Sequence, residues 1–125
     1  MEIQIVENEE NIVQVHTSIG DFKAIWCSST PLISKKYIVE LDSDDVITLD
    51  KVRISDSCNP RIENFEQAIC ITGFVQEIQD AVMILQLDKH LMMLELSANS
   101  DFSQYIGRYV SVRFDEIKLY DTEIY

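Results

Sequence analysis

Apolar and polar residues alternate along most of this chain, with the period of two that β-strands show when only one face is buried. Strand-like runs lie at 3–6, 12–17, 22–27, 37–41, 46–49, 68–78, 82–87, 91–96, 110–114 and 117–120. Two pairs of runs have the spacing of a hairpin, 37–49 across Asp42–Asp45 and 82–96 across Asp88–His90. One short helical turn is predicted at 101–106, where Ser100 can cap its start and Gly107 ends it.

The same alternation predicts which side chains are buried, because successive side chains of a strand point to opposite faces. The residues expected in the core are Trp26, Val39, Leu41, Ile71, Ile84, Leu94, Val110, Val112 and Phe114. Those expected to face solvent are Lys23, Glu40, Glu95, Ser111 and Arg113. Met92 and Met93 are neighbours, so we expect one in the core and the other at the surface. The stretch 55–66 is predicted to be the longest loop.

Composition strengthens the prediction of an all-β fold. The chain has 17 Ile and 10 Val against 9 Leu and 4 Ala, a ratio typical of pleated sheets rather than helices. Its 125 residues, 46% of them hydrophobic, are enough for one domain with a core that needs no disulfide or metal. Segments 23–49 and 67–94 share an order of strand, gap and hairpin, a likeness that any two β-hairpins partly have.

The charge balance narrows the possible partners. Ten basic residues stand against 22 acidic ones, which gives a net charge of −12. Proteins that bind nucleic acid need clustered Lys and Arg for the phosphates, so we expect no nucleic-acid partner. An acidic surface instead favours encounter with a basic protein.

No targeting signal is visible in this sequence. Residues 1–10 are acidic and carry no apolar run of useful length, and no stretch is long enough for a membrane-spanning helix. Cys27, Cys58 and Cys70 are an odd set without metal-binding spacing. We therefore expect a cytoplasmic protein with free thiols, of which Cys27 is buried in a strand, and no membrane partner.

A search for reactive constellations predicts neither catalysis nor a cofactor. His16 and His90 are the only histidines, and no serine or cysteine has a base with an orienting third group at recognisable spacing. Asp42, Asp44 and Asp45 lack the glycine and closing glutamate of a calcium loop. We expect a non-enzyme without catalytic residues, metal or cofactor.

Two resemblances refine the fold prediction. Residues 106–122 resemble the closing strand pair of transport-associated OB domains, in the positions Gly107, Val110, Val112, Leu119, Tyr120 and Asp121. The anion-binding signature of those domains is missing. Residues 22–122 resemble short acidic bacterial proteins with an OB-like barrel, through Trp26, Pro31, the run 37–42 and the run 119–121. That resemblance implies a small antiparallel OB-like barrel over 22–122 with an N-terminal hairpin addition at 1–20, all within one domain, 1–125.

Some of those bacterial proteins are similar to toxin immunity proteins. The resemblance and the charge together suggest an acidic protein-binding module, monomeric or dimeric, that neutralises a basic toxin or nuclease by occluding its active site. A structural or assembly component with an unidentified protein partner and a small-ligand-binding barrel remain open alternatives. The partner-binding residues are expected in two acidic elements, namely Asp42, Asp44, Asp45, and Tyr120, Asp121, Glu123, Tyr125.

Overall fold

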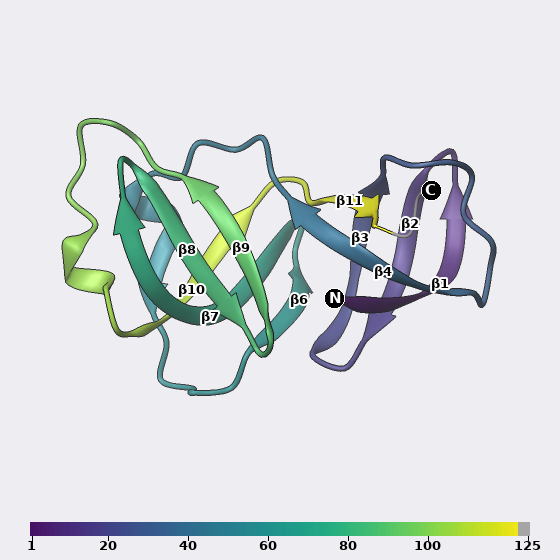
Figure 1. The fold of residues 1–125 in the computed structure, drawn as a ribbon, viewed down its shortest axis with the longest axis horizontal. Coiled ribbons are helices and arrows are strands. Elements are labelled where there is room, and N and C mark those ends of the chain that lie inside the picture. The colour runs from purple at the N-terminus through teal and green to yellow at the C-terminus, as the bar shows by residue number, and fades with distance from the viewer. Residues whose placement is uncertain (123–125) are drawn as a thin grey trace.

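The computed structural model describes residues 1–122, and over that range the fold is all-β with two short 3₁₀ turns (Figure 1). The strands are β1 (Glu2–Glu9), β2 (Ile12–Thr17), β3 (Gly20–Trp26), β4 (Lys36–Asp42), β5 (Val52–Ile54), β6 (Arg61–Phe65), β7 (Ala68–Gln79), β8 (Val82–Leu87), β9 (His90–Glu95), β10 (Tyr109–Phe114) and β11 (Lys118–Asp121). The 3₁₀ turns are η1 (Leu49–Lys51) and η2 (Ser103–Tyr105). The second of these confirms the helical turn before Gly107, whose φ is 77°.

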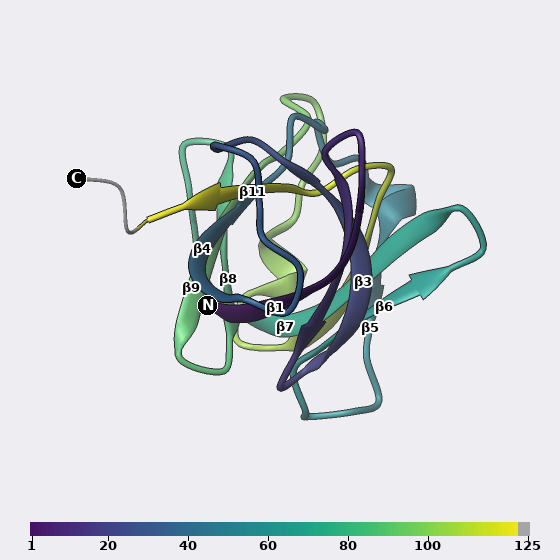
Figure 2. The same ribbon diagram turned by 90° about the vertical axis from the view of Figure 1, so that its right-hand side faces the viewer.

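Strands β1, β2, β3, β11 and β4 close into a small OB-like barrel in that order (Figure 2). Its neighbours are antiparallel except β3 and β11, which run parallel with Trp26 opposite Leu119. The predicted barrel fold is therefore confirmed, but its expected bounds of 22–122 are wrong, because β5 to β10 lie outside the barrel and residues 1–20 are not an addition to it. They supply β1 and β2, because β1 pairs with both β2 and β4 and so completes the ring.

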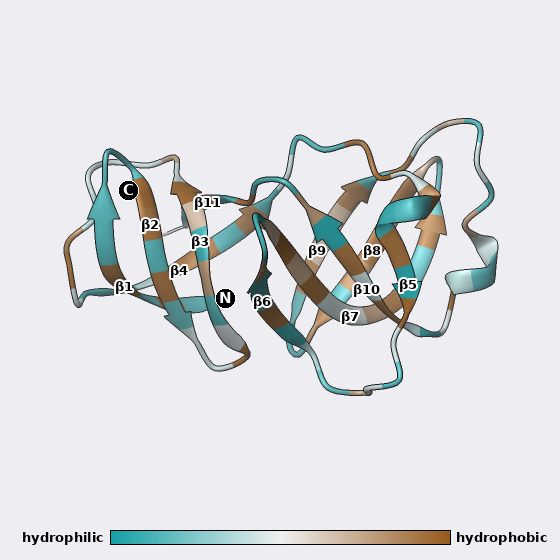
Figure 3. Cartoon of the chain, turned by 180° about the vertical axis from the view of Figure 1, so that it is seen from behind, coloured by the Kyte–Doolittle hydropathy of each residue, from teal (hydrophilic) through white to brown (hydrophobic). Residues whose placement is uncertain are grey.

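The remaining strands form a second sheet in the order β5-β10-β7-β8-β9, and β6 pairs with β7 (Figure 1). A parallel bridge joins Ile47, which precedes β5, to Leu96, just after β9. The β5 end and the β9 end of the second sheet therefore lie close together. Hydrophobic and hydrophilic residues alternate along the strands of both parts (Figure 3). We call the two parts the barrel and the second sheet.

The second sheet repeats the arrangement of the barrel. The β1–β2 pair shifts register between Ile5 and Glu7, and the β7–β8 pair shifts between Val75 and Glu77. The backbone N–H of Cys27 donates to the carbonyl of Leu119 at 2.9 Å, and at the matching place Ser97 donates to Ile47 at 2.9 Å. Strands β7 to β10 thus correspond to β1 to β4, and the segment at Ile47 corresponds to β11.

Each part is completed by a segment that follows a strand of the other part. We call these two segments, β11 in the barrel and the segment at Ile47 in the second sheet, the closing segments. After β4 the chain crosses into the second sheet at Ile47, and after β10 it returns to the barrel as β11. The predicted hairpin 37–49 is therefore wrong, since β4 pairs with β1 and β11 instead of the segment after it. For the same reason β10 and β11 are not partners, although they follow each other directly along the chain.

Most of the expected core is buried. The prediction is wrong for Leu41 and Ile84, because both side chains are only partly buried. In β8 it is Met83, Leu85 and Leu87 that face the core, which turns Ile84 outward. Met92 is buried and Met93 is 65% exposed, as the opposite orientation of neighbouring side chains requires. The confirmed core residues are Trp26, Val39, Ile71, Leu94, Val110, Val112 and Phe114.

The predicted long loop at 55–66 is partly a strand, which corrects the sequence interpretation. Its second half forms β6, which lies along the edge of β3 in the barrel. The N–H of Ile62 donates to the carbonyl of Ile19 at 2.9 Å, and the Oδ1 of Asn64 accepts from the N–H of Lys23 at 3.2 Å. Gly20 permits this approach, because a Cβ there would lie 1.8 Å from the Ile62 carbonyl oxygen.

Candidate functional site: a groove between the barrel and the second sheet

A surface groove of about 470 Å³ lies where β4 and β11 of the barrel meet β9 of the second sheet. We call it the junction groove, and it is lined by Glu40, Leu41, Asp42, Leu91, Met93 and Tyr120. Strands β4 and β9 lie on the same side of the molecule, where the barrel and the second sheet adjoin (Figures 1 and 2). The groove therefore exists only because the two parts pack together.

Strand alternation aims carboxylates and an aromatic ring at the same surface. Along β4, Tyr37 and Val39 point into the core while Glu40 points outward. Tyr120 of β11 lies directly opposite Glu40 in the antiparallel pair, and Lys118 lies opposite Asp42. Side chains in such directly opposed positions are neighbours on one face of the sheet.

Large apolar side chains are exposed beside these carboxylates. Leu91 is 57% exposed and Met93 is 65% exposed, both on the outer face of β9. Ile38 of β4 and Tyr120 of β11 are also exposed. Exposed apolar patches that are rimmed by polar groups are typical of interaction surfaces.

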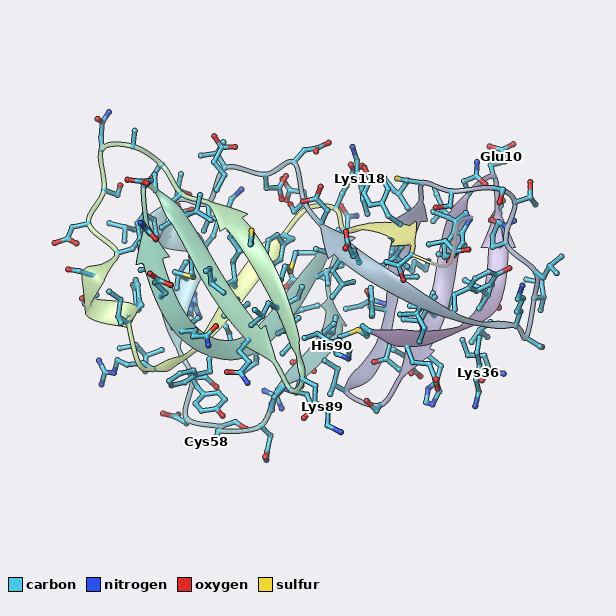
Figure 4. The ribbon with its side chains drawn as sticks, in the orientation of Figure 1. Glu10, Lys36, Cys58, Lys89, His90 and Lys118 are labelled. Atoms are coloured by element: carbon cyan, nitrogen blue, oxygen red, sulfur yellow. The ribbon has the colours of Figure 1, made fainter. Side chains whose placement is uncertain are left out.

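The charge of the groove is negative. Lys118 lies beside the groove (Figure 4). Its ammonium is bound by the Asp44 carboxylate, which raises the pKa of Lys118. The electrostatic interaction with the neighbouring Cys27 raises the pKa of the Tyr120 phenol. Glu40 and Asp42 are exposed at the groove, with Lys118 opposite Asp42 and with the Met1 ammonium near enough to Glu40 for their charges to interact.

The groove contains two of the residues expected from the sequence, Asp42 and Tyr120. Asp44 forms an exposed ion pair with Lys118, and Asp45 accepts a hydrogen bond from the N–H of Asp115 at 2.9 Å, which joins the two crossing segments.

Asp121 donates its backbone N–H to the Oγ of Ser28 at 2.8 Å and is not part of the groove lining. Glu123 and Tyr125 lie outside the described residues. The sequence did not point to Glu40, Leu91 or Met93 as binding residues, because it gave β4 and β9 no common surface.

Three arginines lie together on another part of the molecule. Arg53, Arg61 and Arg113 surround Cys70 on β5, β6, β7 and β10, strands that Figure 3 shows from the opposite side. Burial raises the pKa of the Cys70 thiol, and the nearby Glu63 carboxylate adds to this effect. Three of the ten Lys and Arg residues therefore lie near one another around Cys70.

A second open groove, of about 630 Å³, lies on the outer face of the barrel. Val6, Ile12 and Ile33 are exposed in it, and Glu7 and Lys23 also line it. Its charges are of both signs and it contains no aromatic ring among the residues described. It is therefore a weaker candidate for a charged partner than the junction groove.

Clusters of His, Cys, Asp and Glu side chains are the ones that bind metal ions in proteins. Within residues 1–122 no group of three or more His, Cys, Asp or Glu side chains could hold a metal ion. His16 is bound to Asp21 at 2.5 Å on the exposed surface. Cys27 is exposed, which corrects the expectation that it is buried, because it follows the last residue of β3.

Comparison with known proteins finds no matching family model, no curated relative and no solved structure. In the described part of the chain no helix has the length and apolar character needed to cross a membrane.

Proposed function

We propose that this protein is an acidic protein-binding module that neutralises a basic bacterial toxin, and that the junction groove is its docking surface. The observation that carries the proposal is the grouping of Glu40 and Asp42 around the exposed side chains of Tyr120, Leu91 and Met93. A surface evolved only for solubility would spread carboxylates over the outer faces of the strands, away from exposed apolar groups.

The two kinds of side chain have different tasks in this proposal. The carboxylates, together with the net charge of −12, steer a basic partner and pair with its Lys or Arg side chains. Tyr120 and Met93 then supply apolar anchors, which provide most of the energy in protein interfaces. If those cations belong to the active site of a nuclease, docking would occlude that active site.

The proposal is tested by capturing partners with the native protein and with a double variant, Glu40→Lys and Asp42→Lys. The expected partner is strongly basic, is retained by the native protein only, and is lethal to a bacterial host unless the native protein is expressed with it. A partner that is harmless when expressed alone would favour the assembly-component alternative. A partner that binds both proteins equally would exclude the junction groove as the docking surface.

A further inference from the structure

One edge of β9 is left without a neighbouring strand over most of its length. In the hairpin with β8, the pair Leu87 and His90 flanks a two-residue turn, so His90, Met92 and Leu94 exchange their backbone hydrogen bonds with β8. The N–H and C=O groups of Leu91 and Met93 therefore point away from β8. Among the described residues, this edge is bonded only at its far end, where the Glu95 carbonyl accepts from Ile47 at 2.8 Å.

The corresponding edge in the barrel is covered. Lys23 of β3 corresponds to Met93 of β9. Lys23 pairs with Gln14 in the β2–β3 hairpin, and Met93 pairs with Ile84 at the same position of the β8–β9 hairpin. The Lys23 N–H is bonded to Asn64 of β6, and the neighbouring Ile19 carbonyl is bonded to Ile62 of the same strand. The molecule thus fills one of two equivalent edges with an extended segment of its own chain.

The open edge borders the junction groove, because Leu91 and Met93 line that groove from β9. On the opposite side of the groove lie Glu40 and Asp42 of β4. Backbone donors and acceptors, exposed apolar side chains and carboxylates therefore meet in one place. An extended peptide uses these three kinds of contact when it adds to the edge of a sheet.

We propose that the β9 edge binds an extended segment of the partner by strand addition, at the edge equivalent to the one that β6 covers in β3. This inference rests on the proposed function, in which the partner is basic. The segment would alternate apolar residues, which pack on Leu91, Met93 and Tyr120, with Lys or Arg residues, which reach Glu40 and Asp42. The backbone bonds would supply affinity, and the alternation would supply selectivity.

A synthetic peptide tests this directly. The probe is a short blocked peptide that alternates lysine with valine, and its control carries N-methyl groups on the valine amides, which prevents backbone pairing at one edge. In amide NMR spectra of the full chain, we expect the first peptide to shift the signals of Leu91 and Met93 and to slow their hydrogen exchange. We expect the N-methylated peptide to bind at least about tenfold more weakly, because the loss of each backbone hydrogen bond to the edge lowers the affinity about tenfold.

Matched protein variants separate the backbone from the side chain. Met93→Pro removes an N–H that points to the open edge and leaves the pairing with β8 intact, since proline is tolerated where the N–H side of an edge strand is free. Met93→Ala removes the side chain and keeps the N–H. We expect Met93→Pro to weaken binding of the alternating peptide about tenfold more than Met93→Ala does, with both variants folded as judged by their NMR spectra.

The outcomes distinguish this inference from the proposed function. Equal binding of the two peptides, or unchanged hydrogen exchange at Leu91 and Met93 in the presence of the alternating peptide, would overturn strand addition. If Met93→Pro does not fold, the comparison of the two peptides on the native protein decides. Loss of a captured basic partner in the Glu40→Lys, Asp42→Lys variant would still support the acidic docking surface, whatever the peptides do.

Discussion

The Oδ2 of Asp45 accepts a hydrogen bond from the backbone N–H of Asp115 at 2.9 Å, and this bond joins the two segments that cross between the barrel and the second sheet. Asp45 lies after β4, and Asp115 lies after β10. In the sequence Asp45 is one of several acidic residues in a turn. In the structure it holds together the places where the closing segments are exchanged.

We expect Asp45→Ala to destabilise the protein by about 1 kcal/mol, because the Asp115 N–H loses its charged acceptor. The matched control is Asp44→Ala. Asp44 forms an exposed ion pair with Lys118, and exposed pairs contribute little to stability, so this variant should unfold at nearly the native denaturant concentration. Equal unfolding midpoints for the two variants in urea would contradict the structural role of Asp45.

A second prediction concerns Gly20, where β3 meets β6. Its φ of 140° is unfavourable for residues with a Cβ, and a Cβ would collide with the Ile62 carbonyl oxygen. We expect Gly20→Ala to lower the free energy of unfolding by more than about 1 kcal/mol. Gly107→Ala is the control with a positive φ but open space around the Cβ, so it should cost less. A larger loss of stability in Gly107→Ala would show that β6 does not press against β3 as described.

Much of the fold could be predicted from the sequence because the signals that carry it are local. Alternation along single strands identified most of the strands, though not β6, and placed Val110, Val112 and Phe114 in the core. The error at Ile84 has a local cause as well. The run at 82–87 is apolar at nearly every position, so its alternation does not show which face is inward.

The pairing of the strands could not be predicted in the same way. A hairpin was expected for 37–49 because two strands with a polar turn between them usually pair, yet β4 pairs with the distant β11. The sequence also did not show the true correspondence between the barrel and the second sheet. Segments 23–49 and 67–94 had suggested a likeness, whereas the bulges at Ile5/Glu7 and Val75/Glu77 show a different correspondence. The two parts share a backbone plan and a burial pattern, with few identical residues to reveal it.

The candidate site depends on that long-range pairing. Asp42 and Tyr120 were expected to bind a partner because they are charged or aromatic and lie near strand ends. Glu40, Leu91 and Met93 could not join them, since only the packing of β4 against β9 brings these residues to one groove.

A third prediction concerns the thiols. Cys27 and Cys58 are exposed, whereas Cys70 is half-buried and burial raises the pKa of its thiol. The thiolate is the reactive form, so Cys70 has less of it at neutral pH. With an aromatic disulfide reagent at pH 7.5, we expect two thiols to react rapidly and the third slowly. The Cys70→Ser variant should lose only the slow phase, and loss of a fast phase instead would contradict the described environment of Cys70.

The last prediction concerns the coupling between the barrel and the second sheet. Buried apolar side chains from both parts form one contiguous cluster, and each part is completed by a segment that follows a strand of the other. We therefore expect the chain to unfold in a single cooperative transition. Trp26, the only tryptophan, lies in the barrel and reports on that part alone.

The decisive variant is Met92→Ala, which removes a buried side chain from the second sheet, and its barrel counterpart is Phe22→Ala. Both should destabilise the chain, Met92→Ala by about 2–5 kcal/mol. In each variant the unfolding curve from Trp26 fluorescence should coincide with the curve from far-ultraviolet circular dichroism, which follows all strands. If Met92→Ala shifts the dichroism curve but leaves the Trp26 curve at its native midpoint, the second sheet unfolds on its own. The exchange of closing segments would then join the two parts in space without coupling their stability.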